Sequence, residues 1–379
     1  MLVDLYGIPS FYIRASATLV QHREGDGHML WGVWLLPELL ALALSLAPAC
    51  GVSLPGPGTH VLSRPSNVAR QDNDGIHLAV SPVCAPLSGN TSDANTGIHL
   101  PLIKTIVAFG DSYTDGGRDD GGPLAPPVVV PPDAEAGGRS TDGRVWVEGL
   151  AAPYNATLMD YAQSGACTDL SLWPSAIKQV DFLGQMKTFL NQSNKLDPET
   201  TLYVVFFGIN DFENSKTDGE ANLQAAAQVI LSQIRILAFA PTSARKFLVT
   251  DVYGRGTHTA AGDAMVQTIF SGLHDLSRGI NSTGAGEGLD GKPTGPALTV
   301  AFAEFARIWD GVLDGTPGFE AFGYVSTDAC ITDCSITFCG TDGMCDDPDH
   351  YFYYIPGHPN KEGHQLMADY VEEVLTRCV

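Results

Sequence analysis

Five short apolar runs, separated by segments with helical spacing, dominate the sequence after about residue 101. Most of these runs are apolar on both sides of the two-residue strand repeat, which is typical of strands buried on both faces of a parallel sheet. The segments 221–237, 261–276 and 360–375 have the pattern of amphipathic helices. This alternation predicts a three-layer α/β/α sandwich around a mostly parallel five-stranded sheet. The predicted strands are 104–110, 156–162, 201–208, 246–253 and 297–305.

The first hundred residues differ in composition from the rest and contain one long apolar run at 29–50. The run ends in Ala47-Pro48-Ala49, a small-x-small pattern typical of a signal-peptidase site, which favours a cleaved signal peptide over a transmembrane helix. An N-terminal membrane anchor is the alternative, given the length of the run. We expect a gene-model extension at 1–28 with the natural start at Met29, a signal peptide at 29–49, a linker or N-terminal extension at 50–100 and one globular domain at 101–379.

The charge balance restricts the partners of the chain. Acidic residues number 43 against 21 basic residues, which gives a formal net charge of −22 at pH 7. Such a surface repels phosphate backbones and anionic membranes. We therefore expect no nucleic-acid partner and no stable membrane association. Separately, we expect the chain to be a monomer.

Four of the eight cysteines fall within the segment 330–345 and form no C-x-x-C pair. Together with a secretory signal, this spacing indicates two or more disulfides rather than a zinc site, with the pairing left open. Four N-glycosylation sequons begin at Asn90, Asn155, Asn191 and Asn281. These features predict a secreted, extracellular glycoprotein.

Polar and glycine residues follow three of the predicted strands, where an open parallel sheet collects its chemistry. Ser112 comes just after the first strand, Gly165 after the second and Asn210 after the third. A serine becomes a useful nucleophile beside a general base and with donors for the developing oxyanion. His358, in a Gly-His-Pro loop just before the last predicted helix, is the candidate base. The Gly- and Pro-rich segment 116–143 is predicted to be a long surface loop that could form one lip of a cleft.

Taken together, the motifs FGDSYTDGG, YAQSGA, FFGINDF and GHPNKEGH resemble the four ordered blocks of the SGNH, or GDSL-type, hydrolase family. The resemblance implies a flavodoxin-like sandwich in which Ser112 is the nucleophile and His358 the base. It also implies an oxyanion hole made of the Ser112 and Gly165 backbone N–H groups and the Asn210 side chain, with no metal or organic cofactor. The segment GRVWVE at 143–148 is similar to fungal secreted esterases of the carbohydrate esterase family 16 type.

One departure from the family pattern concerns the group that orients the histidine. The family usually has an Asp three residues before the catalytic His, and Ile355 stands there. Either a backbone carbonyl or another carboxylate must then hold the imidazole. A second histidine, His350, is preceded by an Asp at that spacing but is followed by Tyr351 where the family has Pro, so we prefer His358. The carboxylates left open are Asp346, Asp347 and Asp349.

The resemblance implies a secreted serine ester hydrolase that removes acetyl groups from plant-wall carbohydrates. A lipase or acylhydrolase acting on longer acyl esters is the enzymatic alternative. The missing Asp at position 355 leaves open a second alternative, a catalytically silent, wall-binding protein of the same fold.

Overall fold

The computed structural model describes residues 75–279, 295–335 and 337–379. The chain divides into the units Met1–Leu62 and Ser63–Val379, and all described residues belong to the second. The expectations for 1–28 and 29–49, most of the 50–100 segment and the sequon at Asn281 lie outside the described residues.

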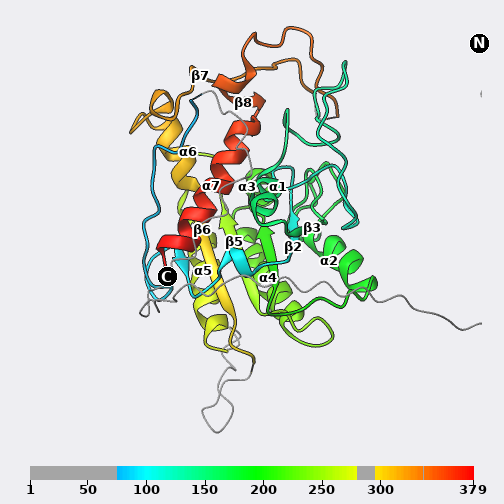
Figure 1. Cartoon of the computed structure of the whole chain (residues 1–379), viewed down its shortest axis with the longest axis vertical. Coiled ribbons are helices and arrows are strands. Elements are labelled where there is room, and N and C mark those ends of the chain that lie inside the picture. The colour runs from blue at the N-terminus through cyan, green and yellow to red at the C-terminus, as the bar shows by residue number, and fades with distance from the viewer. Residues whose placement is uncertain (1–74, 280–294, 336) are drawn as a thin grey trace, which may run out of the picture. The chain divides into compact units, whose positions relative to one another are not determined.

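A six-stranded sheet forms the centre of the described unit, in the order β1-β6-β5-β4-β2-β3 (Figure 1). All neighbours from β2 to β6 are parallel, which confirms the five predicted strands. The predicted total of five is wrong by one edge strand, β1, which pairs antiparallel with β6. A strand of two residues is too short to leave a periodic pattern in the sequence. The strands are β1 Ala94–Asn95, β2 Thr105–Gly110, β3 Thr157–Asp160, β4 Thr201–Phe206, β5 Lys246–Asp251 and β6 Thr299–Glu304.

Helices cover both faces of this sheet, as the sequence predicts. On one face, alternate strand residues such as Phe109 and Val205 pack with α2, α4 and α5 in one apolar core. On the other face, their neighbours Ala108 and Val204 pack with α1, α6 and α7 in a second core. Side chains alternate along a strand, so one apolar run supplies both cores. The helices are α1 Trp146–Ala151, α2 Phe182–Asn191, α3 Ile209–Asp218, α4 Asn222–Ala238, α5 Ala260–Ser277, α6 Ala306–Leu313 and α7 Lys361–Arg377.

A second, three-stranded sheet in the order β7-β8-β9 precedes α7 and carries His358 in its last strand. Asn360 caps α7 by accepting a hydrogen bond from the Gly363 N–H at 2.7 Å. Its Nδ2 donates to the carbonyls of Pro348 and Asp349 at 2.9 and 2.8 Å, which ties the start of α7 to the 3-10 turn just before β8. The remaining elements are β7 Ser326–Ala329, β8 Tyr351–Ile355, β9 His358–Pro359 and the 3-10 helices η1 Leu100–Leu102, η2 Ala152–Tyr154, η3 Phe319–Phe322 and η4 Pro348–His350.

The predicted loop 116–143 contains no helix or strand, and its surface character is interrupted by buried residues in its last third, among them Ala134, Ala136 and Arg139. Arg139 is fully buried there and forms two hydrogen bonds to Glu148 of α1, at 2.7 and 2.9 Å. A buried guanidinium needs such a bidentate carboxylate partner. The Arg139–Glu148 pair therefore draws the loop against α1 and away from solvent.

Three disulfides join six of the seven cysteines in the described residues, and the buried Cys167 is free. Two lie within 330–345, Cys330–Cys345 and Cys334–Cys339, as predicted for that segment. The third, Cys84–Cys378, ties the segment before residue 101 to the end of α7. Together with β1, this bond shows that the folded unit begins before residue 101. No helix among the described residues combines the length and apolar character needed to cross a membrane.

Candidate active site

Ser112 lies in a tight turn at the carboxyl end of β2. The Asp111 carbonyl accepts hydrogen bonds from the N–H groups of Thr114 and Asp115, at 3.0 and 2.9 Å. The Asp111 carboxyl group accepts another from the Tyr113 N–H at 3.1 Å. Neighbouring strands β2 and β4 are paired through Gly110 and Phe206, so the turns that follow them leave the sheet at the same edge.

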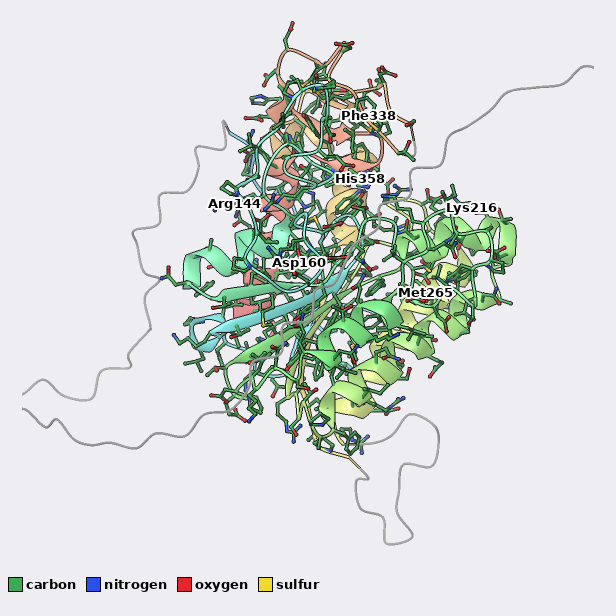
Figure 2. All side chains as sticks on the ribbon, turned by 90° about the vertical axis from the view of Figure 1, so that its right-hand side faces the viewer. Arg144, Asp160, Lys216, Met265, Phe338 and His358 are labelled. Carbon is green, nitrogen blue, oxygen red and sulfur yellow. A yellow bond between two sulfur atoms is a disulfide. The ribbon has the colours of Figure 1, made fainter. Side chains whose placement is uncertain are left out.

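His358 meets Ser112 across 246 positions of sequence, with 2.8 Å between its Nε2 and the serine Oγ. Its other ring nitrogen, Nδ1, lies 3.1 Å from the Pro356 carbonyl oxygen. Because a carbonyl can only accept a hydrogen bond, Nδ1 carries the proton and Nε2 is left as the acceptor. The Ser112 hydroxyl therefore donates to His358, which is the arrangement that a general base requires. Figure 2 labels His358 on the side-chain view.

The sequence left open whether a carboxylate or a backbone carbonyl binds Nδ1 of His358. In the structure this partner is the Pro356 carbonyl. Asp347 contacts His350, with 2.9 Å between Oδ2 and Nδ1, and Asp349 pairs with Lys361. Within the described part of the chain, no carboxylate forms a hydrogen bond with His358. Ile355, which replaces the usual Asp, is paired with His358 across the β8–β9 turn and is buried in a small apolar cluster.

The other candidate histidine, His350, belongs to a different element. It ends the 3-10 helix η4, before β8, and its Nδ1 faces Asp347. The histidine that contacts Ser112 Oγ is His358. Another histidine, His364, is buried in α7, where its Nδ1 accepts a hydrogen bond from the Trp146 N–H at 3.3 Å.

Gly165 lies in the loop after β3 and Asn210 in the first turn of α3, which follows β4 at the same edge of the sheet as Ser112. Among the described residues, the backbone N–H groups of Ser112 and Gly165 have no hydrogen-bond acceptor. The Asn210 side chain donates to the Ala166 carbonyl at 2.9 Å and, in a longer contact of 3.4 Å, to Asp111. Two backbone donors are thus unengaged, whereas Asn210 must give up its longer contact before it can donate to a ligand.

The loop that carries Gly165 has a conformation that favours glycine. Its φ angle is +88°, and a Cβ atom there would lie 2.7 Å from Cδ of Lys178. Glycine therefore avoids both backbone strain and a side-chain clash at this point. Asp211, next to Asn210, fixes the same loop from the other side by accepting hydrogen bonds from Thr168 Oγ1 and Trp173 Nε1, each at 2.6 Å.

Burial and nearby cations keep the imidazole of His358 neutral. Burial lowers its pKa to about 4, a tendency that the Pro356 hydrogen bond opposes and the positive charges of Arg255 and Lys178 strengthen. Burial also raises the pKa of the Asp111 carboxyl group to about 8. At neutral pH the serine is thus flanked by a neutral histidine and a largely protonated acid.

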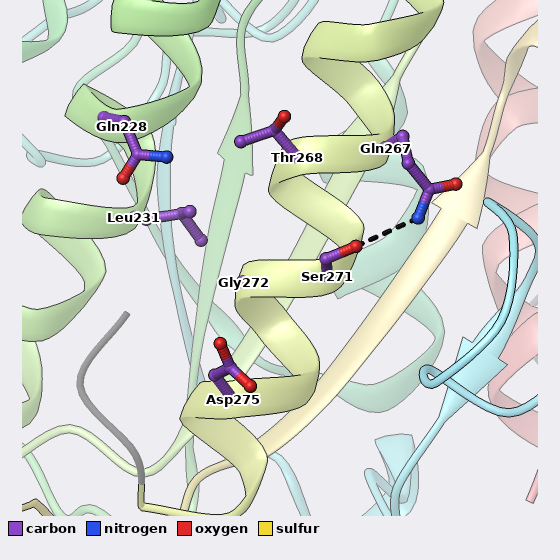
Figure 3. Close-up of a pocket in the computed structure, with 7 residues that line it drawn as sticks. All are labelled: Gln228, Leu231, Gln267, Thr268, Ser271, Gly272 and Asp275. Carbon is purple, nitrogen blue, oxygen red and sulfur yellow. Dashed lines mark hydrogen bonds between the residues drawn. The ribbon is translucent and has the colours of Figure 1, made fainter. Parts of the chain in front are cut away.

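Metal-binding groups and pockets away from Ser112 are the other places where the described residues could hold a ligand. No group of three or more His, Cys, Asp or Glu side chains in that part of the chain could hold a metal ion. A groove of about 260 Å³ lies between α4 and α5 and contains none of the candidate site residues (Figure 3). Its walls carry a hydrogen bond of 3.0 Å from Gln267 to Ser271. The groove is lined by Gln228, Leu231, Gln267, Thr268, Ser271, Gly272 and Asp275.

Sequence reasoning missed the residues that surround the histidine turn. Tyr113 donates from its hydroxyl to the Gly357 carbonyl at 2.6 Å, and Arg255 reaches the same oxygen. Tyr113 could have been noticed because it directly follows the candidate nucleophile. Arg255 belongs to an ordinary loop sequence, and only the fold brings it to His358.

Comparison with known proteins places this site in a family. The profile of the GDSL-like Lipase/Acylhydrolase family matches residues 106–371. An acetylesterase from Hypocrea jecorina is 34% identical over 129 residues, which are 29% of this chain and 35% of that protein. The chain thus matches about a third of the length of this curated relative.

A solved structure is also similar, at low identity. It is a member of the lipolytic protein G-D-S-L family from Veillonella parvula DSM 2008, with 17% identity and a TM-score of 0.35 over 72% of this chain and 98% of that chain. We draw no conclusion from a likeness at this level. The profile match is much stronger evidence of kinship, because it spans well over half of the chain. It includes all four candidate residues, Ser112, Gly165, Asn210 and His358. The chain belongs to the GDSL-like lipase/acylhydrolase family.

Proposed function

We propose that this protein is a serine-dependent carboxylic ester hydrolase in which Ser112 and His358 carry the reaction. The observation that supports the proposal most strongly is the 2.8 Å contact between Ser112 Oγ and the unprotonated Nε2 of His358. A serine hydroxyl that donates to a neutral imidazole is poised to lose its proton as it attacks. The alternative of a catalytically silent protein gives no reason for this arrangement.

The reaction runs in two halves. Ser112 Oγ attacks the ester carbonyl while Nε2 of His358 takes its proton, and the resulting imidazolium returns that proton to the departing alcohol. Water then attacks the acyl-enzyme with the same base and releases the acid. The N–H groups of Ser112 and Gly165 stabilise the negative charge on the tetrahedral oxygen, with the Asn210 amide as the third donor.

A backbone carbonyl, that of Pro356, orients His358 in place of the missing carboxylate. The Pro356 carbonyl fixes the tautomer and the ring orientation through its 3.1 Å contact with Nδ1. It carries only a partial charge, so it stabilises the imidazolium less than an aspartate would. The base is consequently weaker and stays neutral at lower pH.

For the substrate, we propose acetyl esters of plant-wall carbohydrates. The partial match to an acetylesterase supports a short acyl group. We also propose that the protein is secreted and monomeric. Three disulfides among the described residues and the exposed sequon residues Asn90, Asn155 and Asn191 support passage through an oxidising secretory pathway.

Replacement of Ser112 and of the two histidines tests the site directly. Ser112→Ala and His358→Ala should each lower kcat for p-nitrophenyl acetate by at least about 10³-fold, because each removes an atom that takes part in bond making or proton transfer. Ser175→Ala, which removes a hydroxyl bonded to Asp218, and His350→Asn should retain activity. Equal rates for wild type and Ser112→Ala would refute the nucleophile, and a loss confined to His350→Asn would transfer the base to that residue.

The pH profile of kcat/KM tests the state of the base. The imidazole acts when neutral, and its pKa in the folded protein lies below the ordinary value of 6.5. Activity should therefore persist as the pH falls through 6.5 and decline only near pH 4. An acid limb at or above pH 6.5 in the folded enzyme would contradict the neutral, buried histidine.

Acyl-chain dependence separates an acetylesterase from a lipase. With p-nitrophenyl esters from acetate to octanoate, kcat/KM should be highest for acetate, since the proposed substrate offers only two acyl carbons. Release of acetate from acetylated xylo-oligosaccharides, measured in parallel, should depend on Ser112. A preference for octanoate with no acetate release would instead identify a lipase.

A further inference from the structure

We propose that Tyr113 and Arg255 are positioning residues that hold the turn of His358 by binding the Gly357 carbonyl. The inference rests on the proposed function and concerns how a base without a carboxylate partner is kept in line with Ser112. It begins from one geometric fact: two side chains from different loops converge on the single carbonyl between Pro356 and His358.

Tyr113 makes the stronger of the two contacts. Its hydroxyl donates to the Gly357 oxygen at 2.6 Å, and its side chain is fully buried. The ring lies 5.5 Å from the His358 ring, centroid to centroid, and stacks on Phe206 at 5.6 Å. Because Tyr113 directly follows Ser112, this hydrogen bond connects the turn of the nucleophile to the turn of the base.

Arg255 approaches the same oxygen from the loop after β5. Its Nη1 lies 3.4 Å from the Gly357 oxygen, and its Nη2 is 2.9 Å from Glu213 Oε1 in α3. Gly357 has a φ angle of +72°, and a Cβ atom there would lie 2.5 Å from Arg255 Nη1. The guanidinium thus occupies the space that any side chain at position 357 would need.

The Gly357 carbonyl is important for the orientation of His358 because it lies between the two residues that form the histidine turn. The preceding carbonyl, that of Pro356, accepts the Nδ1 proton, and the following residue is the base itself. Rotation of the peptide unit between Gly357 and His358 would move the imidazole relative to Ser112 Oγ. A displacement of about 1 Å at a reacting group can reduce the rate by about 10²-fold. Anchoring this carbonyl therefore supplies the fixed geometry that a carboxylate would otherwise give.

The charge of Arg255 distinguishes its role from that of Tyr113. The groups that face His358 are Arg255 and Lys178, which are cationic, and the neutral side chains of Tyr113 and buried His364. A cation disfavours the imidazolium, so Arg255 both positions the turn and weakens the base. Tyr113 contributes a hydrogen bond without changing the local charge. The two effects can consequently be separated by substitution.

The test compares Tyr113→Phe and Arg255→Met with matched controls, using kcat, KM and the acid limb of the pH profile on p-nitrophenyl acetate. The control Tyr370→Phe removes another buried hydroxyl, which donates to Asp93 at 2.8 Å. The control Lys178→Met removes the other cation that acts on His358 but has no hydrogen bond to the Gly357 carbonyl in the described structure. Thermal unfolding of every variant separates loss of fold from loss of geometry.

Tyr113→Phe should lower kcat by about 10-fold to 100-fold with KM within about twofold and the acid limb in place, because only orientation is lost. Arg255→Met should lower kcat and also move the acid limb upward. Lys178→Met should move the limb in the same direction with a smaller loss of kcat. Tyr370→Phe should keep the wild-type kcat.

A folded Tyr113→Phe enzyme with the same kcat as Tyr370→Phe would overturn the inference while leaving the ester hydrolase intact. A wild-type protein without Ser112-dependent hydrolysis would instead overturn the proposed function. If Tyr113→Phe does not fold, Glu213→Gln is the substitute test. Glu213 is partly exposed, so its replacement should not disturb folding, and it removes the ion pair that holds Arg255. A fall in kcat with unchanged KM then supports the inference, and an unchanged kcat refutes it.

Discussion

The hydrogen bond between His358 Nδ1 and the Pro356 carbonyl determines the chemical state of the whole site. It assigns the proton to Nδ1, which leaves Nε2 free to accept from Ser112. Within the described residues Nδ1 meets a carbonyl rather than a carboxylate, and burial together with the cations Arg255 and Lys178 lowers the histidine pKa. The lowered pKa makes His358 a weaker base, but it also keeps the imidazole neutral in mildly acidic solution.

The fold makes this arrangement possible by bringing distant segments to one edge of the sheet. Strands β2 and β4 are neighbours in the sheet, so the turn of Ser112 and the first turn of α3 with Asn210 lie at the same edge. The histidine arrives separately, on the short β9 strand, directly before α7. Asn360 fixes that junction by capping α7 and bonding to the carbonyls of the η4 segment. The buried tyrosine after Ser112 then links the two halves of the site.

Much of this could be predicted because the informative signals were local. Continuous apolar runs identified the five parallel strands, and four motifs in a fixed order identified the family. The short edge strand β1 carries no periodicity, and the burial of Arg139 depends on a carboxylate supplied by α1. Arg255 reaches the histidine turn only through the fold, from 102 positions away in the sequence. The contact of Ser112 with His358 is more distant still in sequence, but both residues lie in recognisable motifs, whereas Arg255 does not.

Nitrogen NMR of the protein labelled with ¹⁵N-histidine measures directly which ring nitrogen of His358 carries the proton. At neutral pH we expect a neutral imidazole with a protonated Nδ1 and an unprotonated Nε2. The resonances would be assigned by comparison with a His358→Ala variant. An imidazolium at neutral pH, or a neutral ring protonated at Nε2, would contradict the account, because neither form can take the proton of Ser112.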